Sequence, residues 1–92
     1  MNFIISYDLN KDDKNYDGLI EKIKEISTGI WCSPCKSTWV INSSLRSSRE
    51  AYEKLATEID DNDYIIIVEI TTNIYGLMHK DNADFLSKHF MS

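Results

Sequence analysis

The stretch WCSPCKSTWVI, residues 31–41, decides how the rest of the chain folds around it. Its second half, STWVI, is rich in β-branched and aromatic residues, which favour a strand. The apolar run IWC (30–32) indicates another short strand, and Ser33-Pro34 between the two runs is a turn signal. The stretch therefore predicts a β-hairpin in the middle of the chain, not a loop that opens a helix.

The cysteine pair in this hairpin, Cys32 and Cys35, resembles the W-C-G-P-C-K active site of thioredoxins. In such a site a long buried strand precedes the pair, and the helix that follows lowers the pKa of the first thiol. Here only TGIW precedes the pair, a strand follows it, and Pro34 is the only proline. This context favours a structural hairpin over redox catalysis. The alternative is zinc, held by Cys32 and Cys35 of two chains.

Elements of both kinds flank the hairpin. NFIISYDL (2–9) and YIIIVEI (64–70) are apolar, β-rich runs, and the second is predicted to be a strand buried on both faces. NYDGLIEKIKEI (15–26) has the apolar spacing of a helix, with Asn15 as a candidate N-cap. Gly29 is expected to end this helix.

Two further helices are predicted after the hairpin. The capping box SSRE (47–50) opens the first, whose buried stripe is expected to contain Ala51, Tyr52, Leu55 and Ile59. The acidic run DDND (60–63) breaks the chain and is interpreted as a solvated turn. Asp81 is expected to cap the last helix, which would bury Ala83, Leu86 and Phe90.

The order of these elements predicts an α+β, ferredoxin-like βαββαβ fold in a single domain, residues 1–92. Its four-stranded antiparallel sheet would carry two helices on one face, plus a C-terminal helix. The first and third strands are then central and run in opposite directions. The end of the first strand lies beside the start of the third, which brings Asp8 near Ser37 and Thr38.

Charge and composition narrow the choice of partners and location. Fifteen acidic against ten basic residues give a formal net charge of −5, and the basic residues form no run. RNA or DNA binding is therefore disfavoured, because neutralised phosphates supply most of its affinity. The chain has no run of 18 apolar residues and no signal peptide at its start, and its two cysteines suit a reducing compartment. We expect a cytoplasmic protein with no membrane association.

Three features in this order resemble the SinR-like family. The first strand ends in Tyr7-Asp8, the third begins with Ser37, Thr38 and Trp39, and an acidic turn precedes the apolar fourth strand. The SinR-like proteins belong to the CRISPR-associated type-two (adaptation) nuclease superfamily, together with the VapD-like toxins.

The resemblance implies a homodimer in which the first-strand aspartates of two chains face each other. In some members this aspartate is proposed to hold a divalent metal for phosphodiester hydrolysis. Asp8 is thereby the candidate catalytic and metal-binding residue, with Mg²⁺ or Mn²⁺ as cofactor. The candidate binding residues around it are Tyr7, Asn10, Ser37 and Thr38.

Two functions follow as expectations. One is a metal-dependent phosphodiesterase, endoribonuclease-like and centred on Asp8. The other is a non-catalytic protein-binding or scaffold module of a mobile element or defence system. The acidic charge favours a protein partner over nucleic acid for such a module.

Overall fold

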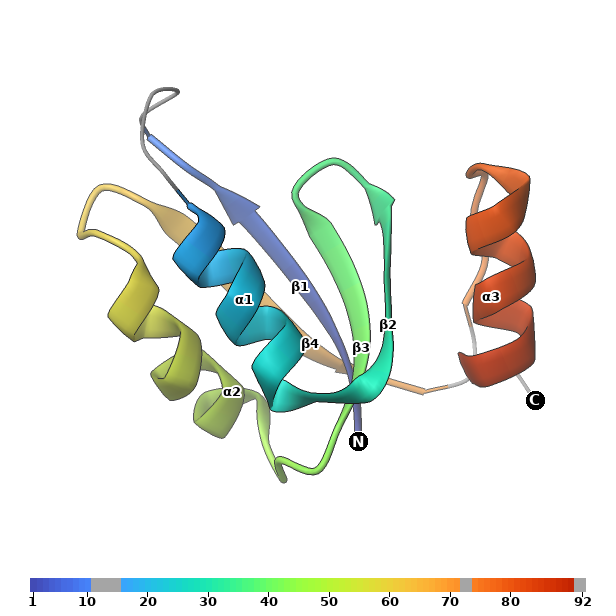
Figure 1. The fold of residues 1–92 in the computed structure, drawn as a ribbon, viewed down its shortest axis with the longest axis horizontal. Coiled ribbons are helices and arrows are strands. Elements are labelled where there is room, and N and C mark those ends of the chain that lie inside the picture. The colour runs from blue at the N-terminus through green and yellow to red at the C-terminus, as the bar shows by residue number, and fades with distance from the viewer. Residues whose placement is uncertain (11–15, 72–73, 91–92) are drawn as a thin grey trace.

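The computed structural model describes residues 1–10, 16–71 and 74–90, and it has the α+β fold expected from the sequence (Figure 1). Its elements are, in chain order, β1 (Asn2–Asp8), α1 (Asp17–Ile26), β2 (Ser27–Cys35), β3 (Thr38–Ser43), α2 (Ser48–Leu55), the short 3₁₀ helix η1 (Ala56–Glu58), β4 (Tyr64–Ile70) and α3 (Lys80–Phe90). The strands form a four-stranded antiparallel sheet in the order β2-β3-β1-β4. The ferredoxin-like prediction is confirmed, and so is the central position of the first and third strands.

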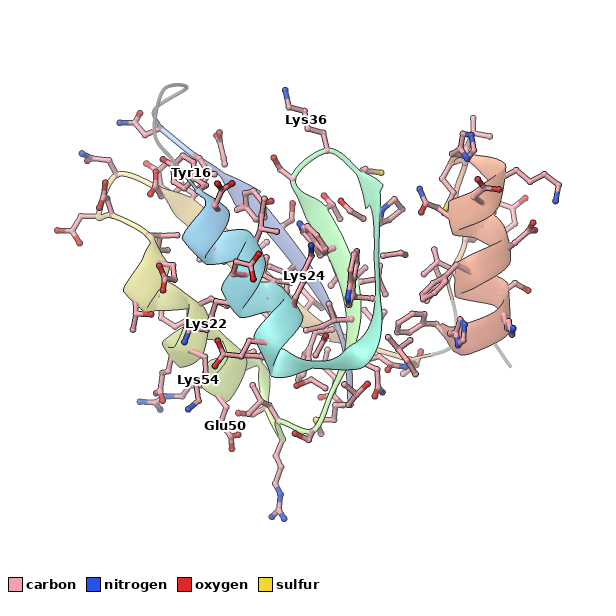
Figure 2. All side chains as sticks on the ribbon, viewed as in Figure 1. Tyr16, Lys22, Lys24, Lys36, Glu50 and Lys54 are labelled. Atoms are coloured by element: carbon pink, nitrogen blue, oxygen red, sulfur yellow. The ribbon has the colours of Figure 1, made fainter. Side chains whose placement is uncertain are left out.

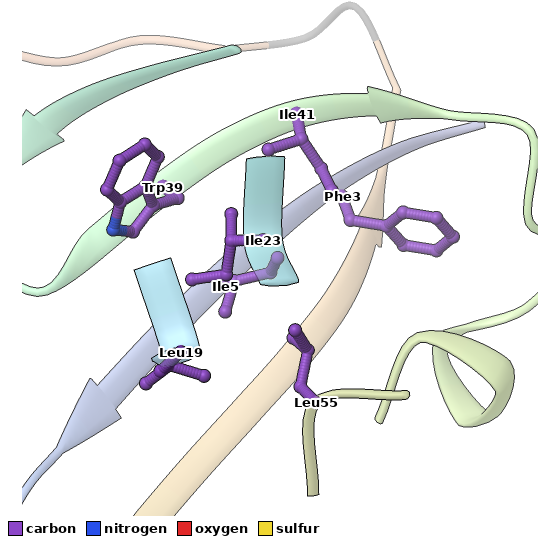
Figure 3. Packing of buried hydrophobic residues seen from close by; sticks show 7 residues of the cluster. All are labelled: Phe3, Ile5, Leu19, Ile23, Trp39, Ile41 and Leu55. Atoms are coloured by element: carbon purple, nitrogen blue, oxygen red, sulfur yellow. The ribbon is translucent and has the colours of Figure 1, made fainter. Parts of the chain in front are cut away.

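One face of the sheet carries α1 and α2 and encloses the main core (Figure 3). Every second residue of a strand points to the same face, so β1 contributes Phe3 and Ile5, and β3 contributes Trp39 and Ile41. The helices contribute Leu19, Ile23 and Leu55, all fully buried. This core forms because the apolar stripes of both helices meet the apolar face of the sheet.

The hairpin forms, but its turn lies three residues later than Ser33-Pro34. β2 continues through Cys35, and Lys36 and Ser37 make the turn before β3. Ser37 takes a left-handed conformation with φ of 59°. The prediction was wrong because Pro34 is accepted within β2, an edge strand whose pairing with β3 is irregular at this end.

The prediction that Gly29 ends the first helix was also wrong. α1 ends at Ile26, and Ser27 already has an extended backbone. Gly29 instead lies inside β2 with φ of +101°, where the pairing with β3 shifts between Ser27 and Trp31. Glycine tolerates this conformation and so permits a bulge in the strand. The predicted N-cap Asn15 lies outside the described residues.

The capping box at the start of α2 is confirmed. The hydroxyl of Ser47 accepts a hydrogen bond from the Glu50 backbone N–H at 3.1 Å, and the Glu50 carboxylate accepts one from the Arg46 N–H at 3.4 Å. Ala51 and Leu55 are buried as expected, whereas Tyr52 is 47% exposed. Tyr52 was misassigned because it follows directly after Ala51 and therefore points about 100° away around the helix.

The second face of the sheet is only partly covered. Leu86 and Phe90 of α3 pack against Cys32 of β2 and Val40 of β3 in a second, smaller core. α3 therefore lies on the β2 side of the molecule (Figure 1). Ala83 was expected to be buried but is exposed. The residue that caps α3 also differs from the prediction. The His79 ring, not Asp81, occupies the capping position, since its Nδ1 accepts a hydrogen bond from the Asp81 N–H at 3.2 Å.

β4 is not buried on both faces, contrary to the prediction. It is an edge strand, and of its residues on the second face of the sheet only Ile70, at its end, packs against the smaller core that contains α3. Tyr64 is 74% exposed, Ile66 61% and Val68 45%. Ile65 and Ile67, which alternate with them, face the main core instead. An apolar row therefore remains exposed on the second face of the sheet.

Candidate functional site

The uncovered part of the second face brings Asp8 together with this apolar row. Cross-strand pairs place Asp8 beside Tyr64, Ser6 beside Ile66 and Ile4 beside Val68. Paired residues point to the same face, so the polar residues of β1 run parallel to the apolar residues of β4. We call this region the open surface and define it by Ser6, Asp8, Thr38, Tyr64, Ile66 and Val68.

Asp8 lies at one end of the open surface. Its side chain is exposed, and it borders a shallow cavity of about 230 Å³ that Ser6, Tyr64 and Ile66 also line. The hydroxyl groups of Ser6 and Thr38 are 3.3 Å apart, which ties the centre of β1 to the start of β3. The result is a carboxylate and two hydroxyl groups beside an apolar strip.

Of the four candidate binding residues, Thr38 lies on the open surface, and Tyr7 borders the cavity beside Asp8 although its ring lies elsewhere. Tyr7 points to the helix-covered face, where its hydroxyl accepts a hydrogen bond from Trp39 Nε1 at 3.1 Å. Ser37 lies in the hairpin turn, and its carbonyl accepts the Tyr7 N–H at 3.1 Å. The backbone N–H of Asn10 donates to Asp63. The alternation of side chains along β1 therefore separates Tyr7 from Asp8.

A buried carboxylate that the sequence reading missed lies close to this end of the sheet. Asp63, interpreted as part of a solvated turn, is only 8% exposed. Its Oδ1 accepts hydrogen bonds from the Asn10 N–H at 2.9 Å and the Tyr16 hydroxyl at 3.0 Å, and its Oδ2 accepts the Asp60 N–H at 2.9 Å. Asp63 thus joins the end of β1, the start of α1 and the turn before β4.

The cysteine pair has the surroundings of a structural element. Cys32 is buried against Val40, Leu86 and Phe90, and Cys35 is exposed at the end of β2. Burial raises the pKa of the Cys32 thiol, which keeps it protonated, whereas a nucleophilic cysteine needs a lowered pKa. No helix begins at either residue. The hairpin reading agrees with these facts better than a thioredoxin-like site does.

Aromatic residues on the helix-covered face also have structural partners. The rings of Trp31 and Trp39 lie 5.2 Å apart between centroids. The Lys24 ammonium group lies 4.8 Å from the centroid of the Trp31 ring, a cation–π contact that covers this indole. These contacts give both tryptophans a role in packing.

Basic residues are interleaved with acidic ones over the surface. Figure 2 shows Lys22 and Lys24 on α1, Lys36 in the hairpin turn and Lys54 on α2. Lys22 and Lys54 border the same shallow depression as Glu50 and Glu53. Arg49 and Lys80 are engaged with acidic residues one helical turn away, Glu53 and Asp84. Such interleaving agrees with the weak nucleic-acid binding expected from the net charge.

The described part of the chain contains neither a metal-binding cluster nor a membrane-spanning helix. Across residues 1–10, 16–71 and 74–90, histidine, cysteine and acidic side chains do not gather in threes that could hold a metal ion. None of the helices in these ranges combines the length and apolar character needed to cross a bilayer. Comparison of the chain with protein-family models, with curated proteins and with solved structures finds no match.

Proposed function

We propose that this chain is a non-catalytic protein-binding module that acts as a homodimer, in which a second copy covers the open surface. The observation that carries the proposal is the exposed row Tyr64, Ile66 and Val68. Three adjacent large apolar side chains, rimmed by the polar Ser6 and Asp8, have the composition of a protein interface. A second copy supplies the same surface in return, as a two-fold axis requires.

The rest of the chain supports a protein partner. The net charge of −5 and the interleaved lysines disfavour a phosphate backbone. The free thiols of Cys32 and Cys35 agree with the reducing cytoplasm. The resemblance to the SinR-like family, whose relatives include dimeric scaffolds, supports a role of this kind in a defence system or mobile element.

The test exchanges an apolar side chain for a charged one on the open surface. In a two-fold dimer, Ile66→Glu removes two isoleucines that are each 61% exposed in the single chain. At about 1.5–3 kcal/mol for a fully covered isoleucine, the dimer loses about 2–4 kcal/mol. Its dissociation constant should rise roughly 30- to 1000-fold. Sedimentation equilibrium measures this change.

A matched control uses Leu77, which is 98% exposed but lies outside the open surface. Leu77→Glu makes the same exchange of an apolar for an acidic side chain and should leave the dissociation constant within about threefold of the parent value, since distant surface changes are nearly neutral. A dimer that Leu77→Glu dissociates and Ile66→Glu does not would refute the open surface as the interface. A monomeric parent protein would refute the proposal itself.

Asp8 favours a second candidate, the metal-dependent phosphodiesterase. Its exposed carboxylate lies on the surface proposed to meet a second copy, beside a cavity and two hydroxyl groups. Two such carboxylates with water suit Mg²⁺ or Mn²⁺, which would polarise a phosphate and activate water when bound. Asp8→Asn should then abolish magnesium-dependent cleavage of labelled RNA.

The melting temperature separates the two candidates. Magnesium or manganese should raise it in the parent protein and not in Asp8→Asn, because a ligand stabilises only the state that binds it. In the non-catalytic module, neither metal changes the melting temperature at constant ionic strength. Asp8→Asn then leaves the dimer intact or strengthens it by removing the repulsion between two carboxylates.

A further inference from the structure

The two edge strands of the sheet, β2 and β4, differ in how well they are protected from pairing with a further strand. β2, at one edge, has two shifts of register against β3, a left-handed glycine at position 29 and Pro34, which has no backbone N–H. α3 also packs against it. Bulges, prolines and covering elements are the means by which proteins prevent additional pairing at an edge. β2 is therefore a protected edge.

β4, at the other edge, shows none of these features within residues 1–10, 16–71 and 74–90. It pairs with β1 without interruption from Tyr64 to Ile70. Its sequence YIIIVEI contains no proline, lysine or arginine, and six of its seven residues are apolar. An edge strand that is regular and apolar offers unpaired backbone groups to a further strand.

Acidic residues lie at both ends of this edge. Asp8 is the cross-strand neighbour of Tyr64, and Asp60 and Asp61 precede β4 in the turn. A groove of about 410 Å³ opens between this turn and the end of α2, with Tyr52 and Tyr64 among its lining residues, and none of the described residues in its wall is basic. Glu69 lies near the other end of the strand.

This charge distribution selects among the strands that could pair with β4. A second copy of β4 would bring its own acidic turn against the same acidic ends, so like charges would meet. A segment that carries arginine or lysine would meet opposite charge at the turn and at Glu69. The groove contains both tyrosine rings and carboxylates. An arginine side chain suits it, because a guanidinium group can stack on a tyrosine ring and pair with a carboxylate.

We propose that the outer edge of β4 binds an extended segment of a protein partner that alternates apolar and basic residues, and that this segment pairs as a fifth strand. The proposal rests on the proposed function, in which the dimer is a protein-binding module, and names the chemistry of its partner. Apolar side chains of the segment extend the row Tyr64, Ile66 and Val68, because side chains alternate between faces. Its basic side chains point to the helix-covered face, toward the groove beside Tyr52.

The probe is a fluorescein-labelled nonapeptide of alternating valine and arginine, followed by fluorescence anisotropy at physiological salt. One control replaces arginine by glutamate, and the other carries N-methyl groups on alternate backbone amides. The parent peptide should bind at least about tenfold more tightly than either control, since addition of a strand requires both free amides and complementary charge. On the protein, the double change Asp61→Asn and Glu69→Gln should weaken binding and reduce its salt dependence.

Two results would overturn the proposal. Equal binding of the N-methylated peptide would mean that charge alone attracts the probe, without pairing. Dissociation of the dimer by the peptide would mean that a second copy, not a partner segment, occupies β4. The test is separate from that of the proposed function. If the peptide does not bind while Ile66→Glu still dissociates the dimer, the open surface remains the dimer interface and only the edge proposal fails.

Discussion

Replacing Asp63 by asparagine should destabilise the protein by about 3 kcal/mol. The side chain is 8% exposed, and its Oδ1 accepts hydrogen bonds from the Asn10 N–H and the Tyr16 hydroxyl. The single oxygen of an asparagine amide can replace Oδ1. Its NH₂ group then takes the place of Oδ2 and faces the Asp60 N–H, a donor against a donor.

The magnitude follows from the bond that is lost. A hydrogen bond to a charged group contributes about 1.5–3 kcal/mol, and a buried donor without an acceptor costs about 1–3 kcal/mol. These two effects overlap, so we expect about 3 kcal/mol in total. For a domain of this size each kcal/mol lowers the melting temperature by about 4–8 °C, which gives a decrease of roughly 12–24 °C.

Urea unfolding at one fixed protein concentration measures the change, since association also contributes to stability. The matched control is Asp61→Asn, which makes the same chemical change at an exposed neighbouring position. It should alter the free energy of unfolding by about 0.5 kcal/mol or less. Equal stability of the two variants would refute the role of Asp63 as the junction between β1, α1 and β4.

Three other predictions concern the two cysteines and the second core. Iodoacetamide should modify the exposed Cys35 quickly and Cys32 slowly, as mass spectrometry of digested protein would reveal, and rapid labelling of Cys32 would contradict its burial. Because the pKa of Cys32 is raised in the folded state, the folded protein holds this proton more tightly than the unfolded chain. Stability should therefore fall as the pH rises past the ordinary pKa of a thiol, by more in the parent protein than in Cys32→Ala. Leu86→Ala, at a residue that is 2% exposed, should cost about 2–5 kcal/mol and release α3, with hydrogen exchange increasing in residues 80–90. An unchanged exchange rate there would refute the packing of α3 against β2.

The fold was predictable because its signals are local and agree with one another. β-branched and aromatic residues follow the cysteine pair after two intervening residues, and this argued against a helix at the centre of the chain. The capping box at Ser47 located the start of α2 without any knowledge of tertiary contacts. Once the order of strands and helices is known, handedness rules leave few sheet topologies.

Burial and partners were less predictable, because they depend on what lies across space. Six apolar residues in YIIIVEI look the same in a central strand and in an edge strand, so the exposure of Ile66 could not be read from the run itself. Asp63 occurs in a run of acidic residues typical of solvated turns. Its burial depends on the Tyr16 hydroxyl, 47 positions away in the chain.

The candidate site was predictable only in part for the same reason. A strand that ends in Tyr-Asp suggests two neighbouring polar groups, yet alternation sends Tyr7 and Asp8 to opposite faces. The apolar row beside Asp8 comes from β4, more than 50 residues away, and no motif announces it. The order of elements nevertheless indicated that β4 would be exposed, since a βαββαβ order places the fourth strand at an edge of the sheet.

The most direct test of the central claim, that a second copy covers the open surface, follows side-chain methyl signals by NMR as the protein is diluted from millimolar to micromolar concentration. If the dimer forms in this way, the methyl signals of Ile66 and Val68 shift with dilution, while those of the buried Ile5 and Ile41 stay constant. Constant signals from Ile66 and Val68 in a protein that tumbles as a single 10.7 kDa chain would contradict the claim.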